Sequence, residues 1–259
     1  MILRGTPFVH PDIFAILPGL KLDRLIAKHR STGRTAAHRL IAAGRVKVDG
    51  AIVTDGRQDV DRFTRIELDE AVIQPPERAL YLMMHKPVGI LSATVDPQHP
   101  TVIDLIDDPQ KHTLHMAGRL DRGTSGLVLL TNDGRWSKRI IDPRHKMPKV
   151  YLVETSEPIS PDAVAAFAAG FHFHTENITT LPADLEITGS HSARLSLIEG
   201  RYHQVKRMFH RIGNRVVKLH RQSIGSLALP PDLAASQWRH LTAEEVASVH
   251  VNGTSDGVM

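Results

Sequence analysis

Residues 118–134 read GRLDRGTSGLVLLTNDG, which places one carboxylate, Asp121, among arginines and glycines and just ahead of an apolar run. The run Leu127–Leu130 predicts a buried strand, and such a strand holds the neighbouring backbone in fixed geometry. Glycines beside the acid leave room for another molecule to approach. The segment therefore predicts a reactive acid on a rigid support. Taken alone, an Asp at this place is more often a simple loop or cap residue.

Two further stretches carry side chains suited to chemistry. Residues 149–153 read KVYLV, a strand pattern in which Tyr151 follows a segment rich in basic residues. Residues 199–209 read EGRYHQVKRMF, which predicts a turn from a strand into a basic helix. Each stretch also has a plain structural interpretation, as a half-buried strand tyrosine and as an amphipathic helix with a basic outer face. Their order and spacing after Asp121 favour a shared function.

Together the three stretches resemble the motifs of pseudouridine synthases, in the branch that contains the enzyme of small-subunit ribosomal RNA. Residues 85–90, HKPVGI, are similar to the opening of the synthase domain in that family. The resemblance implies that Asp121 is the essential carboxylate, that Tyr151 packs against the target uracil, and that Lys206 is the cation paired with Asp121. A nearby cation favours the ionised carboxylate that nucleophilic attack or proton removal needs. The resemblance further implies RNA contacts from Arg119, Lys149, Arg201, His203 and Gln204.

The activity implied by this resemblance is the isomerisation of uridine to pseudouridine, with 16S ribosomal RNA in a small-subunit ribonucleoprotein particle as the expected partner. The N1–C1′ bond breaks, the uracil turns, and C5 joins C1′ with loss of the C5 proton. No redox change occurs, so no cofactor is expected. Attack by Asp121 on C1′ and assistance of elimination at C2′ both stay open. Gly123 departs from the family, most of whose members have a polar or acidic residue there, and this difference concerns the rigidity of the loop.

Positive charge is concentrated near the N-terminus. Residues 20–48 contain eight Lys and Arg against one acid, in a chain whose formal net charge is +4. Such a concentration is typical of a surface that binds a polyanion. The apolar spacing of Leu22, Leu25 and Ile26 predicts one helix, that of Ala36, Ala37, Leu40 and Ile41 predicts a second that ends at Gly44, and the Asp49-Gly50 turn predicts a hairpin. This order resembles the S-four-type RNA-binding module first described in a ribosomal protein, which nominates Arg24, Arg34, Arg39, Arg45 and Lys47 as RNA ligands.

The chain is predicted to form five segments: an extension over 1–18, the RNA-binding module over 19–69, a linker over 70–78, the synthase domain over 79–251 and a tail over 252–259. Pro75-Pro76 marks the linker. Short strands and helices alternate without regular βαβ units. The expected class is therefore α+β, with a mixed, mainly antiparallel sheet flanked by helices.

The composition argues against a disulfide-bonded, metal-binding or membrane-spanning protein. The sequence contains no Cys, and it lacks an apolar run long enough to span a membrane. We therefore expect a cytoplasmic monomer without a membrane or metal partner. The pairs His112/His115 and His172/His174 invite a metal site, but neither has a third ligand at suitable spacing. Gly123–Gly126 resembles a hydrolase elbow only superficially, since it lacks one residue between Ser and Gly.

Two other functions stay open from the sequence. The same chemistry could act on 23S ribosomal RNA. The chain could instead be a non-catalytic RNA-binding factor of ribosome assembly that keeps the fold. Retention of Asp121, Tyr151 and Lys206 together favours catalysis, because a protein that only binds RNA has no use for all three.

Overall fold

The computed structural model describes residues 20–251. Within this range the chain divides into two compact units, the first ending at Ala79 and the second beginning at Leu80. The expected extension over 1–18 and the expected tail over 252–259 lie outside the described residues. None of the helices within 20–251 combines the length and the apolar character that a membrane span requires.

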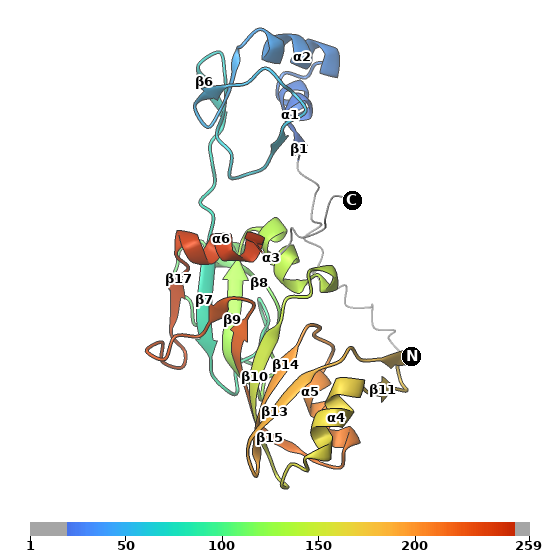
Figure 1. The fold of residues 1–259 in the computed structure, drawn as a ribbon. Helices are drawn as coiled ribbons and strands as arrows, with labels where there is room; N and C mark the ends of the chain where they lie inside the picture. Colours follow the sequence, from blue (N-terminus) through green and yellow to red (C-terminus); the bar gives the residue numbers. More distant parts are fainter. Residues whose placement is uncertain (1–19, 252–259) are drawn as a thin grey trace, which may run out of the picture. The chain divides into compact units, whose positions relative to one another are not determined.

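The smaller unit consists of two helices and two sheets (Figure 1). A four-stranded antiparallel sheet has the order β3-β2-β5-β6, and β1 pairs with β4. Both predicted helices and the hairpin turn at Asp49-Gly50 are confirmed. The elements are β1 (Leu20–Lys21), α1 (Leu22–His29), α2 (Arg34–Ala42), β2 (Val46–Val48), β3 (Ala51–Ile52), β4 (Asp59–Val60), β5 (Ile66–Leu68) and β6 (Ala71–Gln74).

The core of this unit joins the apolar faces of α1 and α2 to the alternate residues of β2 and β5. Leu22, Ile26 and Ile41 are fully buried against Val46 and Ile66. Residues spaced three or four apart on a helix share one face, whereas every second residue of a strand does so, and both periods meet here. The unit therefore has a hydrophobic core of its own.

The predicted linker over 70–78 is wrong for residues 71–74, which form β6 at the edge of the sheet. The turn before it places Asp69 and Glu70 at positive φ, 52° and 66°. This turn geometry is typical of a tight hairpin and is usually built with Asn or Gly, so the pair Asp69-Glu70 does not mark a turn in the sequence. The Gln74 side chain donates to the main-chain oxygens of Asp61 and Thr64, which fixes the end of the strand.

The larger unit is built on one nine-stranded sheet with helices on both sides. Figure 1 shows α4 and α5 beside the half that contains β13 and β15, and α3 and α6 beside β7, β8 and β9. Its strands are β7 (Tyr81–Lys86), β8 (His115–Met116), β9 (Ser125–Thr131), β10 (Lys149–Thr155), β13 (Asp184–Gly189), β14 (Ser192–Leu197), β15 (Val216–Ile224), β16 (Leu227–Ala228) and β17 (Trp238–His240), with the separate pair β11 (His172–Phe173) and β12 (Ile178–Thr179). Its helices are α3 (Gly134–Ile141), α4 (Asp162–Ala169), α5 (Gln204–Arg211) and α6 (Ala243–Val251), with 3-10 turns at Lys111–Thr113 and Pro143–His145.

The main path of this sheet runs β13-β14-β10-β15-β9-β7-β17. All neighbouring pairs on that path are antiparallel except β15 with β9, which are parallel over two residue pairs. The predicted α+β class with a mixed, mainly antiparallel sheet is confirmed. The parallel contact brings β15, late in the chain, against the strand that follows Asp121.

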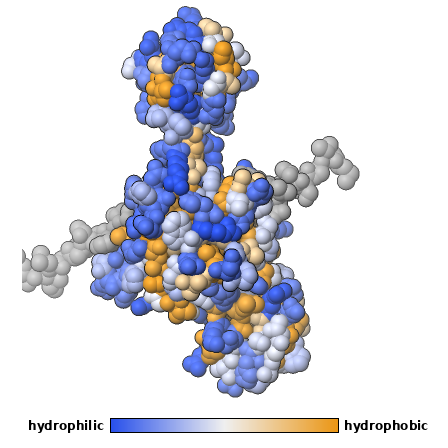
Figure 2. All heavy atoms as spheres, turned by 90° about the vertical axis from the view of Figure 1, so that its left-hand side faces the viewer, coloured by the Kyte–Doolittle hydropathy of each residue, from blue (hydrophilic) through white to orange (hydrophobic). Residues whose placement is uncertain are grey.

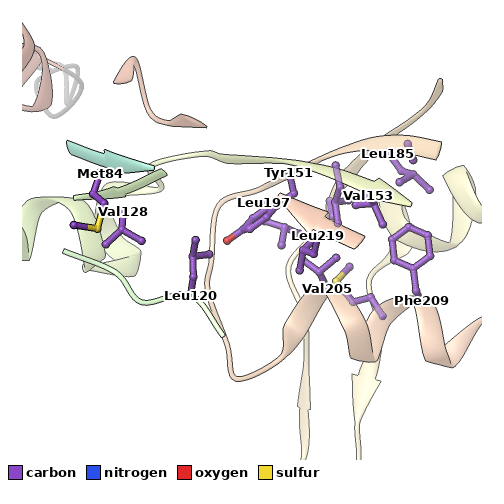
Figure 3. Close-up of a cluster of buried hydrophobic side chains, with 14 of the residues drawn as sticks. Met84, Leu120, Val128, Tyr151, Val153, Leu185, Leu197, Val205, Phe209 and Leu219 are labelled. Atoms are coloured by element: carbon purple, nitrogen blue, oxygen red, sulfur yellow. The ribbon is translucent and has the colours of Figure 1, made fainter. Parts of the chain in front are cut away.

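The strand after Asp121 is buried on both faces. In β9, Val128 and Leu130 belong to one core cluster, whereas Leu127 and Leu129 belong to another around Trp136. Successive side chains of a strand point to opposite faces, so the unbroken apolar run fills both cores at once. Figure 3 shows part of the first cluster, where Val128 lies near Met84. The strand is thereby the rigid support that the sequence predicts.

Candidate active site

Asp121 lies in the loop between β8 and β9, and two backbone hydrogen bonds shape that loop. The amide of Thr124 donates to the oxygen of Asp121 at 3.0 Å, and the amide of Gly89 donates to that of Arg122 at 2.8 Å. The second bond ties the loop to the segment after β7. The carboxylate is half-buried, with 26% of its side chain exposed.

Lys86, at the end of β7, holds this loop from inside the protein. Its side chain is fully buried, and its ammonium group donates to the carbonyl oxygens of Thr124 at 2.8 Å, Pro87 at 3.0 Å, Asp121 at 3.2 Å and Arg122 at 3.4 Å. Burial lowers the pKa of Lys86 to about 8, partly opposed by the charge of Asp121. A buried cation whose donors all meet main-chain oxygens acts as a clamp on the loop backbone.

Arg221, in β15, holds the other end of the loop. Its guanidinium is buried and donates to the oxygens of Leu127 at 2.8 Å, Gly118 at 3.2 Å and Arg119 at 3.3 Å. The strands approach so closely that a Cβ at Gly126 would lie 2.2 Å from the carbonyl oxygen of Arg221. Gly126 also has φ +111°, which L side chains rarely adopt. Two buried cations from separate strands thus fix the backbone around Asp121.

Two side chains from the start of α5 meet the Asp121 carboxylate. Lys206 Nζ lies 3.4 Å from Oδ2, and His203 Nε2 lies 3.4 Å from Oδ1. His203 precedes the first residue of the helix and has φ +51°, a strained value for a residue with a Cβ. This backbone conformation places the His203 ring beside the Asp121 carboxylate. The structure therefore brings together Asp121 and the cation that the sequence pairs with it.

A cavity of about 460 Å³ opens beside these groups and is lined by Asp121, His203, Lys206 and Tyr151. This volume falls in the range of small-ligand sites. The Tyr151 ring is 7% exposed and packs in the main core cluster. Figure 3 shows its hydroxyl pointing toward Leu120, the residue before Asp121. Among the described residues that hydroxyl forms no hydrogen bond, so it is available to a ligand in the cavity.

Lys149 and Arg119 also line this cavity. Lys149 donates to the oxygen of Met147 at 2.9 Å, and burial together with the charge of Arg221 lowers its pKa to about 8. The Arg119 side chain is exposed while its main-chain oxygen is held by Arg221. Both predicted RNA-binding residues thus lie on the wall of the cavity.

The side chains of Gln204 and Arg201, both predicted to bind RNA, are instead bound to Glu199 within the protein. Gln204 is buried, its amide nitrogen donates to Glu199 at 2.6 Å, and its amide oxygen accepts from the Arg201 main-chain N–H at 2.9 Å. The Arg201 guanidinium donates to the other Glu199 oxygen at 3.0 Å. Glu199 is therefore the centre of a small network that shapes the turn before α5, and Gln204 serves that turn in this structure.

The five basic residues nominated in the smaller unit fall into two groups. Arg34 is bound to buried Asp23, Arg45 to Asp69 and Lys47 to Glu70, at 2.6 to 2.9 Å. Arg24 and Arg39 are exposed and have no ion-pair partner within residues 20–251. On the face drawn in Figure 2, the smaller unit is mostly hydrophilic, with small separate hydrophobic areas. The positive charge of residues 20–48 is thus partly neutralised by Asp23 within that stretch and by Asp69 and Glu70 after it.

Three residues that support the site escaped the sequence analysis as site residues: Lys86, Arg221 and Glu199. Their partners are main-chain oxygens or neighbouring turn residues, and no spacing rule marks such contacts. Two of them did lie in quoted motifs, Lys86 within HKPVGI and Glu199 at the start of EGRYHQVKRMF. In the described part of the chain, no group of three His, Asp or Glu side chains is arranged to hold a metal ion.

Comparison with known proteins agrees with this geometry. Residues 80–211 match the family model of RNA pseudouridylate synthase, and the chain belongs to this family. A protein of Pseudomonas aeruginosa named ribosomal small subunit pseudouridine synthase A is 51% identical over 89% of this chain and 100% of its own length. The protein of that name from Escherichia coli K12 is 44% identical over the same shares. A solved crystal structure of pseudouridylate synthase aligns with TM-score 0.65 and 39% identity over 89% of this chain and 99% of its own.

Proposed function

We propose that this enzyme isomerises a specific uridine of small-subunit ribosomal RNA to pseudouridine, with Asp121 as the essential carboxylate. The observation that carries the proposal is the convergence of Asp121, Lys206 and Tyr151 on one cavity from a loop, a helix and a strand. The names of the relatives from Pseudomonas aeruginosa and Escherichia coli support the small-subunit target.

The reaction exchanges one glycosidic bond for another. The N1–C1′ bond breaks, uracil rotates, the C5–C1′ bond forms, and the proton lost from C5 balances the one gained at N1. Oxidation states do not change, so the proposed mechanism needs no redox cofactor. A cavity that holds the detached uracil beside its ribose keeps the two fragments in position to recombine.

Three polar groups of the cavity have a proposed part in the chemical exchange itself. The Asp121 carboxylate either attacks C1′ or assists elimination at C2′, and Lys206 stabilises its ionised form. The Tyr151 ring packs against the uracil, and its hydroxyl offers a path for the C5 proton. The rigid clamp of Lys86 and Arg221 keeps the carboxylate aimed at the ribose.

The basic side chains around the cavity and on the smaller unit are proposed to hold the RNA backbone. Arg119 and Lys149 lie on the cavity wall, while Arg24 and Arg39 are exposed on the S-four-like unit and have no ion-pair partner among residues 20–251. A base within a helix is out of reach, so the target uridine is bound flipped or already unpaired. In this proposal the enzyme acts as a monomer in the cytoplasm, where ribosomal particles assemble.

The test is pseudouridine mapping on 16S and 23S RNA, each supplied free and in ribosomal particles, with the wild-type enzyme and with Asp121→Asn. Asn keeps the shape of the side chain and removes its charge. We expect one new pseudouridine in 16S RNA that is absent with the variant. Modification of 23S RNA would overturn the target. Unchanged modification by Asp121→Asn would overturn the catalytic assignment. RNA binding without modification by the wild type would favour an assembly factor.

A further inference from the structure

An exposed aromatic ring stands next to the active site without a role in the mechanism above. Tyr202, which immediately precedes His203, has 75% of its surface exposed. In the described part of the chain it is the only aromatic residue among the exposed large hydrophobic ones. Single exposed hydrophobic residues are common on protein surfaces, so exposure alone assigns Tyr202 no role. Its position beside His203, which lies next to Asp121, does point to one.

The Tyr202 ring is stacked on the His203 ring. Their centroids are 3.9 Å apart and their planes differ by 17°. His203 is in turn placed 3.4 Å from the Asp121 carboxylate. The ring of Tyr202 is therefore one step from the reacting groups, with one face on His203 and the other open to solvent.

The turn that carries Tyr202 is fixed on both sides. The Arg201 main chain is held by Gln204, and its side chain is held by Glu199. The oxygen of Tyr202 accepts a hydrogen bond from Arg207, whose guanidinium also pairs with Glu176 at 2.7 Å. An aromatic platform that is ordered before binding loses less conformational freedom when a ligand stacks on it.

We propose that Tyr202 is a stacking site for the nucleobase that flanks the target uridine in the RNA strand. This inference rests on the proposed function, since it takes single-stranded RNA as the ligand. Every nucleobase has a π face that can stack on an aromatic ring. When the target base enters the cavity at Asp121, its neighbour loses its own stacking partner. Tyr202 replaces that partner and continues the stack through His203.

The first test compares binding of a 16S RNA transcript by the wild type, Tyr202→Ala and Tyr202→Phe. Loss of one base–aromatic stack is expected to weaken affinity about 5- to 100-fold for Ala, while Phe, which keeps the ring, binds like the wild type. Val217→Ala, which shortens another exposed side chain, is the matched control and should change nothing. Thermal unfolding of Tyr202→Ala should match that of the wild type, because the ring is exposed.

The second test locates the stacked base once the modified uridine has been mapped. Synthetic RNA carries 2-aminopurine on one side or the other of that uridine, and its fluorescence reports stacking. We expect one of the two positions to be quenched by the wild type and by Tyr202→Phe but not by Tyr202→Ala, and KM to rise more than kcat falls. Unchanged affinity and quenching with Ala, or a Phe variant as weak as Ala, would overturn the inference. A wild type that binds RNA without forming pseudouridine would overturn only the proposed function, and the binding comparison would still decide the role of Tyr202.

Discussion

The ammonium group of Lys86 is fully buried and lies 3.2 Å from the main-chain oxygen of Asp121, so a cation without access to solvent holds the backbone of the proposed catalytic residue. The carboxylate of Asp121 lies 3.4 Å from a second cation, Lys206, which belongs to a different element, helix α5. Backbone and side chain are thus positioned by different lysines. The two lysines can be tested separately, because one acts on the loop and the other on the charge.

Lys86 predicts a pH-dependent difference in stability between the wild type and Lys86→Met. Burial lowers the pKa from 10.5 to about 8 in the folded protein, so above pH 8 the unfolded chain binds the proton that the folded protein has lost. The unfolded state then binds more protons, and stability rises with pH between about 8 and 10.5. From pH 7.5 to 9.5 the wild type should gain up to about 2 kcal/mol relative to the variant. Urea unfolding of both proteins at each pH measures this gain, and a difference that stays constant would contradict it.

Lys206 predicts a loss of turnover without a loss of fold. In Lys206→Met the partner of Asp121 at 3.4 Å is removed, whereas the apolar stem is kept. Contacts with a charged group contribute about 1.5 to 3 kcal/mol, which corresponds to a decrease in kcat of roughly 10- to 100-fold. Single-turnover formation of pseudouridine measures the effect.

The matched control for Lys206 is Arg211→Met, in the last turn of the same helix. Arg211 is exposed, and its guanidinium lies 3.5 Å from the His174 ring and not beside Asp121, so this variant removes one positive charge and leaves the carboxylate as it is. Its kcat should stay within about threefold of the wild type. Equal losses in both variants would mean that Lys206 acts only through the general charge of the surface.

Of two glycines near Asp121, only Gly126 should be sensitive to substitution by Ala, whereas Gly123 should tolerate it. At Gly126 the new Cβ would overlap the backbone of Arg221, and φ is +111°, so the free energy of unfolding should fall by about 3 kcal/mol or more. At Gly123 the nearest atom outside the adjoining residues would be Lys206 Nζ at 3.9 Å, an ordinary contact, and the change in the free energy of unfolding should stay within about 0.5 kcal/mol. Chemical unfolding compares the two, and a tolerated Gly126→Ala would contradict the close approach of β9 and β15.

Local periodicity accounts for the parts of the fold that could be predicted. The apolar spacing of Leu22 and Ile26 and the run Leu127–Leu130 each satisfy a simple pattern, and both elements are present. β6 was missed because Asp69-Glu70 forms its turn without Gly or Asn. Turn propensities describe the residues that usually occupy such positions. Here the hydrogen bonds between β5 and β6 keep Asp69 and Glu70, which are unusual in this turn, at positive φ.

The sequence motifs also predicted only part of the candidate site, because some of its contacts join residues far apart in the sequence. The three motifs indicated Asp121, Tyr151 and Lys206, which the structure gathers at one cavity. Lys86 and Arg221 were not identified as loop supports, because their partners are carbonyl oxygens brought close only by the β7–β9 and β15–β9 pairings. Contacts between main chain and side chain across distant strands leave no local pattern in the sequence.

The smaller unit predicts different salt responses for two exposed arginines. Arg39 has no ion-pair partner within the described residues, whereas Arg45 is bound at 2.6 Å to Asp69. If the unit holds RNA phosphates, Arg39→Gln should weaken binding and reduce the slope of log affinity against log salt by about one. Arg45→Gln combined with Asp69→Asn removes both members of an ion pair that is already balanced, so this double variant should keep the salt slope of the wild type. Filter binding of 16S RNA over a series of salt concentrations distinguishes the two, and identical slopes for both variants would show that the ion pairs do not determine which arginines meet the RNA.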